Sequence, residues 1–282
     1  MGGGTIAEKW LAEVLDAREK IMPITPFQAK IAKILACNRT PGSYLAGDAA
    51  MHFEPNSIRY SQDLDYFHDS ETLVAEAYAA DRALLIKEGY EIQLELHQPG
   101  YIRTVVRSSD GATKIEWAHD SAWRFMPTYF LNDRGFTLHP VDLTINKVLA
   151  LAGRDEPRDY LDVLHAHESI LELSGLVWAA CGKDPGFTPH SLLELLQRKG
   201  RYRESDFQRL QLNIAIDLVS MKKNWLSALS AVHLTINRLP AVEVGCLYYH
   251  LNNKKFVVPG EDKSSDVVPH FASKGGILPR IK

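Results

Sequence analysis

The hydrophobic pattern of this 282-residue chain changes its period near residue 139, and this change constrains the fold more than any other feature. Before it, short runs rich in β-branched and aromatic residues end at Pro-Gly and Asp-Gly turns and alternate with helical stretches. After it, apolar residues recur at helical spacing, as in Val141, Ile145, Val148, Leu149 and Ala152. The pattern predicts an α+β chain, in which a domain built on a mixed sheet is followed by a helical C-terminal domain.

The expected domain boundaries follow from this pattern. Residues 1–139 form the N-terminal α/β domain and residues 140–252 the helical domain. Residues 253–282 are rich in Lys, Pro, Gly and Ser, so we expect them to form a poorly packed C-terminal tail. The expected helices cover residues 6–20, 26–37, 70–88, 158–170, 192–196 and 207–239, with another beginning at Pro140. The expected strands cover residues 43–46, 64–67, 91–97, 101–108, 113–118 and 136–139.

Composition and charge argue against several classes of protein. No apolar run approaches the roughly 18 residues of a membrane span, and the N-terminus lacks the pattern of a signal peptide. Cys37, Cys181 and Cys246 form no Cys-x-x-Cys motif, which is typical of reduced thiols in the cytoplasm. The net charge of −3 argues against a wholly basic nucleic-acid binder. Late basic residues could be a solvated surface or a local basic face: Arg198, Lys199, Arg201, Arg203, Lys222, Lys223, Lys254 and Lys255.

Asp63 and Asp65 are candidate metal ligands. On a strand, residues i and i+2 point to the same face with Cα atoms roughly 6.6 Å apart, so their carboxylates can converge on a divalent cation. Mg²⁺ prefers oxygen ligands of this kind together with phosphate oxygens. An Asp-x-Asp pair alone is a weak signal, because a solvated strand end explains most such pairs.

Three further features favour a metal site. The residues that flank the pair are apolar or aromatic, which indicates a partly buried strand. The upstream turn at Gly47-Asp48 opens a helix, whose backbone N–H groups can meet a phosphate. A third acid, Glu116, lies on a later predicted strand. A solvent-facing position for Glu116 stays open as the alternative.

Three runs of the sequence carry a resemblance to a known family. They read YLAGDAA at residues 44–50, RYSQDLDYF at residues 59–67 and PVDLTINKVLALAGRDEPRDYLD at residues 140–162. Their order and spacing are far more specific than an Asp-x-Asp pair, and together they resemble the AbiEii/AbiGii-type nucleotidyltransferase toxins. The resemblance covers roughly residues 43–164. It implies the DNA polymerase β-like nucleotidyltransferase fold for the mixed sheet domain.

The resemblance also implies the roles of individual residues. Asp63 and Asp65 would hold Mg²⁺ or Mn²⁺, with Glu116 as the third acid, while Lys147 and Asp159 would complete the catalytic set. The nucleotide-binding residues would be Gly47, Asp48, Lys147, Arg154 and Arg158.

Several of these residues have structural alternatives. Lys147 could extend along an amphipathic helix to reach solvent, and Arg158-Asp159 could be an ion pair at a helix N-terminus. Asp48 departs from the family pattern, which has Gly or Ser there, and it would repel a triphosphate unless a cation intervened. Asp48 could instead cap the following helix. Asp142 is better explained as a first-turn acid of its helix than as a catalytic residue.

The implied activity is transfer of a nucleoside monophosphate from an NTP to an acceptor hydroxyl. MenT-type relatives extend the 3′ end of tRNA, so RNA is the implied acceptor and a protein side chain is the rival. The protein would act as the toxin of a toxin–antitoxin or abortive-infection system, with a cognate antitoxin as a candidate partner. The alternative is a catalytically degenerate domain that binds a partner or a nucleotide without turnover, and Asp48 is its main support.

Overall fold

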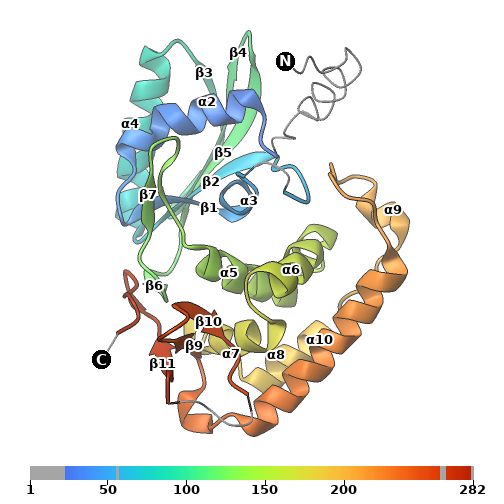
Figure 1. Ribbon diagram of the computed structural model, residues 1–282. Helices are drawn as coiled ribbons and strands as arrows, with labels where there is room; N and C mark the ends of the chain where they lie inside the picture. Colours follow the sequence, from blue (N-terminus) through green and yellow to red (C-terminus); the bar gives the residue numbers. More distant parts are fainter. Residues whose placement is uncertain (1–22, 55–56, 261–264, 281–282) are drawn as a thin grey trace, which may run out of the picture.

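The first part of the chain folds as the sequence predicts. The computed structural model describes residues 23–54, 57–260 and 265–280 (Figure 1), so the helix expected over residues 6–20 lies outside the described residues. The helices of this part are α2 (Pro26–Leu35), α3 (Gly47–Met51) and α4 (Glu71–Lys87), with a 3₁₀ turn at Ala36–Asn38. The strands are β1 (Ser43–Ala46), β2 (Asp63–His68), β3 (Glu91–Gln98), β4 (Tyr101–Ser108), β5 (Gly111–His119), β6 (Trp123–Arg124), β7 (Tyr129–Leu131) and β8 (Gly135–Thr137).

Local signals set the ends of the two longer helices. The Thr25 hydroxyl accepts from the Gln28 backbone N–H while the Gln28 side chain accepts from the Thr25 N–H, so a capping box begins α2. The Ser70 hydroxyl accepts from the Leu73 N–H and begins α4. Gly89, with a φ of +85°, ends α4 in a left-handed conformation that favours glycine.

One seven-stranded mixed sheet, in the order β3-β4-β5-β2-β1-β8-β7, organises this part of the chain. Side chains alternate along β2, so Leu64 and Tyr66 pack in one core cluster with α2 and α4. Figure 1 shows these two helices on one side of the sheet and α5 and α6 on the other. Asp63 and Asp65 therefore occupy the face of β2 that is turned away from α2 and α4.

The second part of the chain is mostly helical, as expected. Its helices are α5 (Pro140–Gly153), α6 (Pro157–Ser169), α7 (Leu173–Lys183), α8 (Pro189–Gln197), α9 (Glu204–Phe207) and α10 (Leu218–Arg238), with a 3₁₀ turn at Ala241–Glu243. The helix expected over residues 207–239 is shorter, because Asp217 accepts from the backbone N–H groups of Val219 and Ser220 and begins α10 there. Helix α7 was not predicted. It is buried on almost every side, so it has no polar face and no helical period.

The expectation of a poorly packed tail was wrong over the described residues. Strands β9 (Cys246–His250), β10 (Lys255–Val257) and β11 (Val267–Phe271) form an antiparallel sheet. Strand β12 (Ser273–Lys274) pairs with β6 in the first part of the chain, and His270 Nε2 lies 2.9 Å from the Phe125 carbonyl oxygen. The Lys, Pro and Gly residues between these strands made their short apolar runs hard to detect.

The buried apolar residues form two large core clusters. One contains the apolar residues of the sheet, α2 and α4, and the other those of α5 to α10 with β9 and β11. A small third cluster joins Tyr44 and Ala46 of β1 to Leu143 of α5, and so fixes α5 against the sheet. In the described ranges, we find no helix with the length and apolar character that a bilayer crossing requires.

Candidate active site

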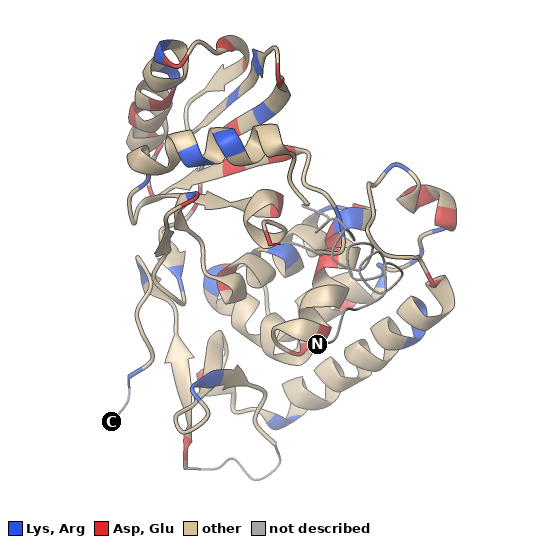
Figure 2. Ribbon diagram, turned by 45° about the horizontal axis from the view of Figure 1, so that its top comes forward, with Lys and Arg blue, Asp and Glu red and all other residues tan. Residues whose placement is uncertain are grey.

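A pocket of about 740 Å³ lies between the free face of β2 and β5 and the helices α5 and α6. Figure 2 shows acidic and basic segments close together on the helices that face the sheet. The pocket brings together eight of the nine residues that the sequence singled out as its site: Gly47, Asp48, Asp63, Asp65, Glu116, Lys147, Arg154 and Arg158.

The acids Asp63, Asp65 and Glu116 share one wall of this pocket. Strands β2 and β5 are parallel, and their register places Asp65 directly opposite Glu116. Asp63 is two residues from Asp65 on the same face, and all three side chains line the pocket. The alternative of a solvent-facing Glu116 outside the site is therefore wrong.

Asp63 and Asp65 are the carboxylates of this wall that lack a direct ion pair within the described residues. Neither side chain forms a hydrogen bond or an ion pair with another residue in the ranges that the structure describes. Burial, followed by the negative charges of Asp48 and Glu116, raises the pKa of Asp63. Burial and then the charge of Asp63 raise the pKa of Asp65 well above its usual range. A bound divalent cation would remove this repulsion.

The carboxylate oxygens of these three acids suit a hard cation, but the acids are not arranged as a complete metal site. No group of three His, Cys, Asp or Glu side chains in the described ranges has the arrangement of one. Glu116 Oε1 accepts from Arg103 Nε at 2.8 Å. Asp63 and Asp65 could hold Mg²⁺ or Mn²⁺ through their oxygens. Glu116 could join them through its second carboxylate oxygen, and Arg103 would compete with the metal for this carboxylate.

Gly47 is required where β1 turns into α3. Its φ is +58°, a left-handed conformation that favours glycine, and a Cβ atom at this position would overlap the Asp65 carboxylate. Because β1 pairs with β2 in a register that places Ala46 opposite Asp65, the turn lies directly against that side chain. Gly47 thus allows the backbone of the turn to approach the candidate metal ligand.

Lys147 points into a group of acids instead of toward open solvent. Its ammonium group pairs with Asp48 and lies 2.9 Å from Asp162 Oδ2 and 3.2 Å from Asp159 Oδ1. Burial alone would lower the pKa of Lys147, but the charges of Asp162, Asp48 and Asp159 outweigh it and raise that pKa. The structural alternative, in which Lys147 extends to solvent, is therefore wrong.

Asp48 takes part in the same cluster and does not cap α3, whose N-cap residue is Ala46. Besides Lys147, it pairs with Arg59 Nη2 at 2.8 Å and lies 3.8 Å from Arg158. Burial would raise the pKa of Asp48, but Lys147 and Arg59 hold it well below its usual range. Lys147 and Arg59 therefore partly compensate the negative charge of Asp48, and its repulsion of a bound phosphate is weakened.

Sequence reasoning missed Arg59, Asp162 and His52, which complete this buried cluster. Arg59 donates through Nε and Nη2 to Asp162 at 2.7 and 2.6 Å, and His52 Nε2 lies 2.9 Å from Asp162 Oδ1. Arg59 and Asp162 do belong to the runs that carry the family resemblance. No spacing rule pairs them, because they come from distant parts of the chain.

Asp159 lies beneath the pocket and does not line it. It is fully buried, and its carboxylate accepts from Arg154 Nε at 2.6 Å as well as from Lys147. The expected Arg158-Asp159 pair is thus replaced by Arg154-Asp159. Arg154 and Arg158 both keep part of their surface exposed at the pocket. Asp159 therefore positions cations that can meet a ligand.

Two further cations, Arg103 and Lys183, also line the pocket, and Lys183 Nζ lies 3.3 Å from Asp120 Oδ2. Asp142, in contrast, has the structural role that the sequence favoured. It lies in the first turn of α5 and accepts from the backbone N–H groups of Phe125 and Met126. The site thus has a carboxylate wall on the sheet and a mostly cationic wall on the helices.

Comparisons with known proteins give structural matches only. No family model and no curated protein matches the sequence. Among solved structures, MenT4, a nucleotidyltransferase toxin from Mycobacterium tuberculosis H37Rv, matches with 14% identity and a TM-score of 0.49, over 85% of this chain and 92% of MenT4. JHP933 from Helicobacter pylori matches with 16% identity and a TM-score of 0.44, over 74% of this chain and 91% of its own. Cid1, which has RNA terminal uridylyl transferase activity, matches with 11% identity and a TM-score of 0.28, over 93% of this chain and 81% of Cid1.

Proposed function

We propose that the protein is a metal-dependent nucleotidyltransferase. An acceptor hydroxyl oxygen attacks the α-phosphorus of an NTP and forms a new P–O bond. The bond from the α-phosphorus to the oxygen that bridges to the β-phosphorus breaks, so pyrophosphate leaves. The hydroxyl proton passes to a carboxylate of the pocket. The acceptor therefore gains one nucleoside monophosphate.

The observation that carries the proposal is the unpaired state of Asp63 and Asp65. Most other charged groups of the pocket form an ion pair, whereas these two carboxylates form none within the described residues. Burying like charges together costs free energy unless a cation binds or a proton is taken up. We infer that Mg²⁺ or Mn²⁺ binds there and, when bound, stabilises negative charge on phosphate oxygens.

The opposite wall would hold the triphosphate. Arg158 and Arg154 lie at the pocket with part of each side chain exposed, and a guanidinium group donates two parallel hydrogen bonds to a phosphate. Asp159 orients Arg154 through the 2.6 Å hydrogen bond. The ammonium group of Lys147 would compensate the negative charges of the acids near Arg158. From its position among these acids it would approach the triphosphate.

The acceptor and the biological role are proposed from the sequence resemblance over residues 43–164. It supports an RNA 3′ end, with tRNA as the first candidate, and a protein hydroxyl as the rival acceptor. It also supports a toxin role in the cytoplasm with a cognate antitoxin as partner. The late basic residues would then contact the phosphates of the acceptor.

A second candidate is a degenerate domain that binds a nucleotide or a partner without turnover. Two observations favour it: the Lys147 ammonium group already forms ion pairs with three acids, and Arg103 forms an ion pair with Glu116. A nucleotide could still bind to Arg154 and Arg158. Catalysis would fail because the third acid stays with Arg103.

The two candidates are separated by pyrophosphate release. The protein is incubated with each NTP in turn, with Mg²⁺ or Mn²⁺, and with total RNA. We expect release of pyrophosphate and labelling of RNA, both abolished in the Asp63→Asn variant. Wild type that binds NTP but releases no pyrophosphate under any of these conditions would support the degenerate binder instead.

A further inference from the structure

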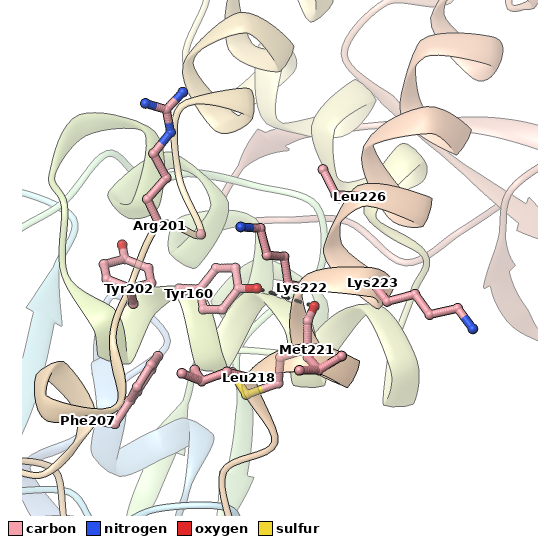
Figure 3. Close-up of a pocket in the computed structure, with 11 residues that line it drawn as sticks. Tyr160, Arg201, Tyr202, Phe207, Leu218, Met221, Lys222, Lys223 and Leu226 are labelled. Carbon is pink, nitrogen blue, oxygen red and sulfur yellow. Dashed lines mark hydrogen bonds between the residues drawn. The ribbon is translucent and has the colours of Figure 1, made fainter.

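A second pocket, of about 830 Å³, lies between α6, the segment that follows α8, and the start of α10. Figure 3 shows its aromatic, apolar and basic side chains. We call it the Tyr202 pocket, and it is lined by Tyr160, Gly200, Arg201, Tyr202, Phe207, Leu218, Val219, Met221, Lys222, Lys223 and Leu226. No residue of this set belongs to the candidate active site.

Tyr202 supplies the accessible aromatic surface of this pocket. Its ring centroid lies 5.2 Å from that of Tyr160 and 5.7 Å from that of Phe207, and these two rings are almost fully buried. The Tyr202 hydroxyl donates to Asp155 Oδ1 at 2.7 Å. The ring is therefore held in one orientation before any ligand arrives, which lowers the entropy lost on binding.

Behind the lining residue Gly200 lies a buried hydrogen-bond donor without an acceptor. Trp225 is 2% exposed, and its Nε1–H has no partner in the part of the chain that the structure describes. This donor lies behind Gly200, where a Cβ atom would be 3.2 Å from Nε1 and 2.9 Å from Trp225 Cδ1. Gly200 also has a φ of +80°, so both conformation and space require glycine at this wall.

Three cations and no acid line the Tyr202 pocket. Arg201, Lys222 and Lys223 are exposed, and none has an ion pair within the described ranges. Figure 3 shows Lys222 beside Tyr160 and Tyr202, whereas the Lys223 side chain points away from them. Aromatic rings next to unpaired cations are the chemistry that binds single-stranded nucleic acid.

Helix α6 places the Tyr202 pocket next to the candidate active site. Arg158 lines the active-site pocket and Tyr160, two residues later, lines the Tyr202 pocket. Residues two apart lie on different sides of a helix, so the pockets are separated by about 10–12 Å, the diameter of a helix with its side chains. A few nucleotides of single-stranded RNA can span that distance.

We propose that the Tyr202 pocket binds one nucleotide of a single-stranded RNA acceptor, upstream of the 3′ end that enters the active site. Its base stacks on Tyr202, and its phosphates lie against Lys222 and Arg201. This inference rests on the proposed function, because it names where the acceptor of that reaction binds.

The test measures RNA binding without NTP or metal. A single-stranded RNA of about a dozen nucleotides, enough to reach both pockets, is titrated against wild type and variants over a series of salt concentrations. Tyr202→Leu should weaken binding at least about fivefold and leave the salt dependence unchanged, because it removes stacking. Lys222→Ala should weaken binding and reduce the slope of log affinity against log salt by about 0.7, the value for one phosphate contact.

Lys33→Ala is the control, since it removes the same charge from an exposed lysine of α2 that lines neither pocket. Equal losses for Lys222→Ala and Lys33→Ala would overturn the proposal in favour of a diffuse basic surface. Unchanged RNA affinity in Tyr202→Leu would also overturn it. If that variant instead changed only self-association in sedimentation, the pocket would be a protein interface.

These outcomes are distinct from failure of the proposed function. RNA binding that depends on Tyr202 and Lys222, without any nucleotide transfer, would leave the pocket assignment standing and remove the enzymatic one. If the protein transfers nucleotide to RNA but neither substitution changes its RNA affinity, the enzymatic assignment stands and the pocket assignment is removed.

Discussion

The ammonium group of Lys147 on α5 forms an ion pair with the carboxylate of Asp48 on α3, 99 residues earlier in the chain. Asp159 and Asp162 of α6 pair with the same ammonium group. Lys147 is thus the central cation of a buried cluster that joins the sheet to the helices. This position changes what a substitution there should do.

We expect Lys147→Met to lower the free energy of unfolding by about 3–5 kcal/mol, because removing one partner of a buried ion pair leaves uncompensated charges. Urea unfolding at neutral pH measures this. Lys183→Met is the matched control, since the Lys183 side chain is equally buried but pairs with one partly exposed acid, Asp120. A Lys147→Met loss no greater than that of Lys183→Met would contradict the cluster.

Much of the fold could be predicted from the sequence because local hydrophobic patterns determine where most helices and strands form. The strands at residues 43–46 and 101–108 have the expected period, and β2, β3 and β5 extend the expected runs by a few residues. Helix α7 could not be found, because a helix buried on all sides loses the polar face that reveals its period. The pairing of β12 with β6 depends on tertiary contacts that no local pattern encodes.

Most residues that the sequence singled out for the site line one pocket, but their charge balance could not be predicted. The two-residue spacing of Asp63 and Asp65 placed both on one strand face, the later acidic strand added Glu116, and the resemblance added Arg158. The partners of Lys147 could not be predicted, because they lie on two other helices, α3 and α6, whose packing against α5 no local pattern encodes. Spacing gives the face of an element that a residue occupies, whereas its partner depends on what packs against that face.

The second prediction concerns Asp65→Asn. In metal-free buffer at neutral pH this variant should be more stable than wild type, because it removes a buried charge beside Asp63. A raised carboxyl pKa in the folded state gives wild type stability that is present below the unfolded pKa and lost as pH rises through the folded pKa. The advantage of the variant should therefore shrink as the pH falls through the raised folded pKa of Asp65, and it should be lost below about 4, the unfolded value.

The same variant should lose activity. One anionic oxygen ligand is gone, so nucleotide transfer should fall by about a thousandfold or more, in line with the several kcal/mol that charge stabilisation by a metal contributes. Added Mg²⁺ should raise the melting temperature of wild type and not that of the variant. A variant that transfers nucleotide at the wild-type rate would remove Asp65 from the metal site.

The third prediction concerns Gly47→Ala. The variant combines an unfavourable left-handed conformation, which costs about 1–2 kcal/mol, with overlap against Asp65. We expect lower stability and loss of transfer. Gly89→Ala is the control, because Gly89 has a φ of +85° with nothing near its missing Cβ. It should show the conformational cost alone and keep full activity; similar activity losses in both variants would show that the contact with Asp65 is unimportant.

The last prediction concerns the ion pair between Arg103 and Glu116, in which Arg103 would compete with a metal for the third acid. Arg103→Gln should raise the affinity for Mg²⁺ by up to about fivefold, because a partly exposed ion pair is worth at most about 1 kcal/mol. Isothermal titration calorimetry with Mg²⁺ and no nucleotide measures this. Arg107→Gln removes the same charge from the same face of β4, and Arg107 has no ion pair within the described ranges, so it controls for the general change in charge.

A double-mutant cycle decides whether Glu116 itself is the ligand. In a Glu116→Gln background, Arg103→Gln should no longer raise the affinity beyond the effect of Arg107→Gln, since there is no carboxylate left to release. If the gain persists in that background, Arg103 acts on Asp63 and Asp65 through its charge, and Glu116 is not a ligand. If the gain disappears, Arg103 competes with the metal for Glu116, and the three acids that share the pocket wall act as one site.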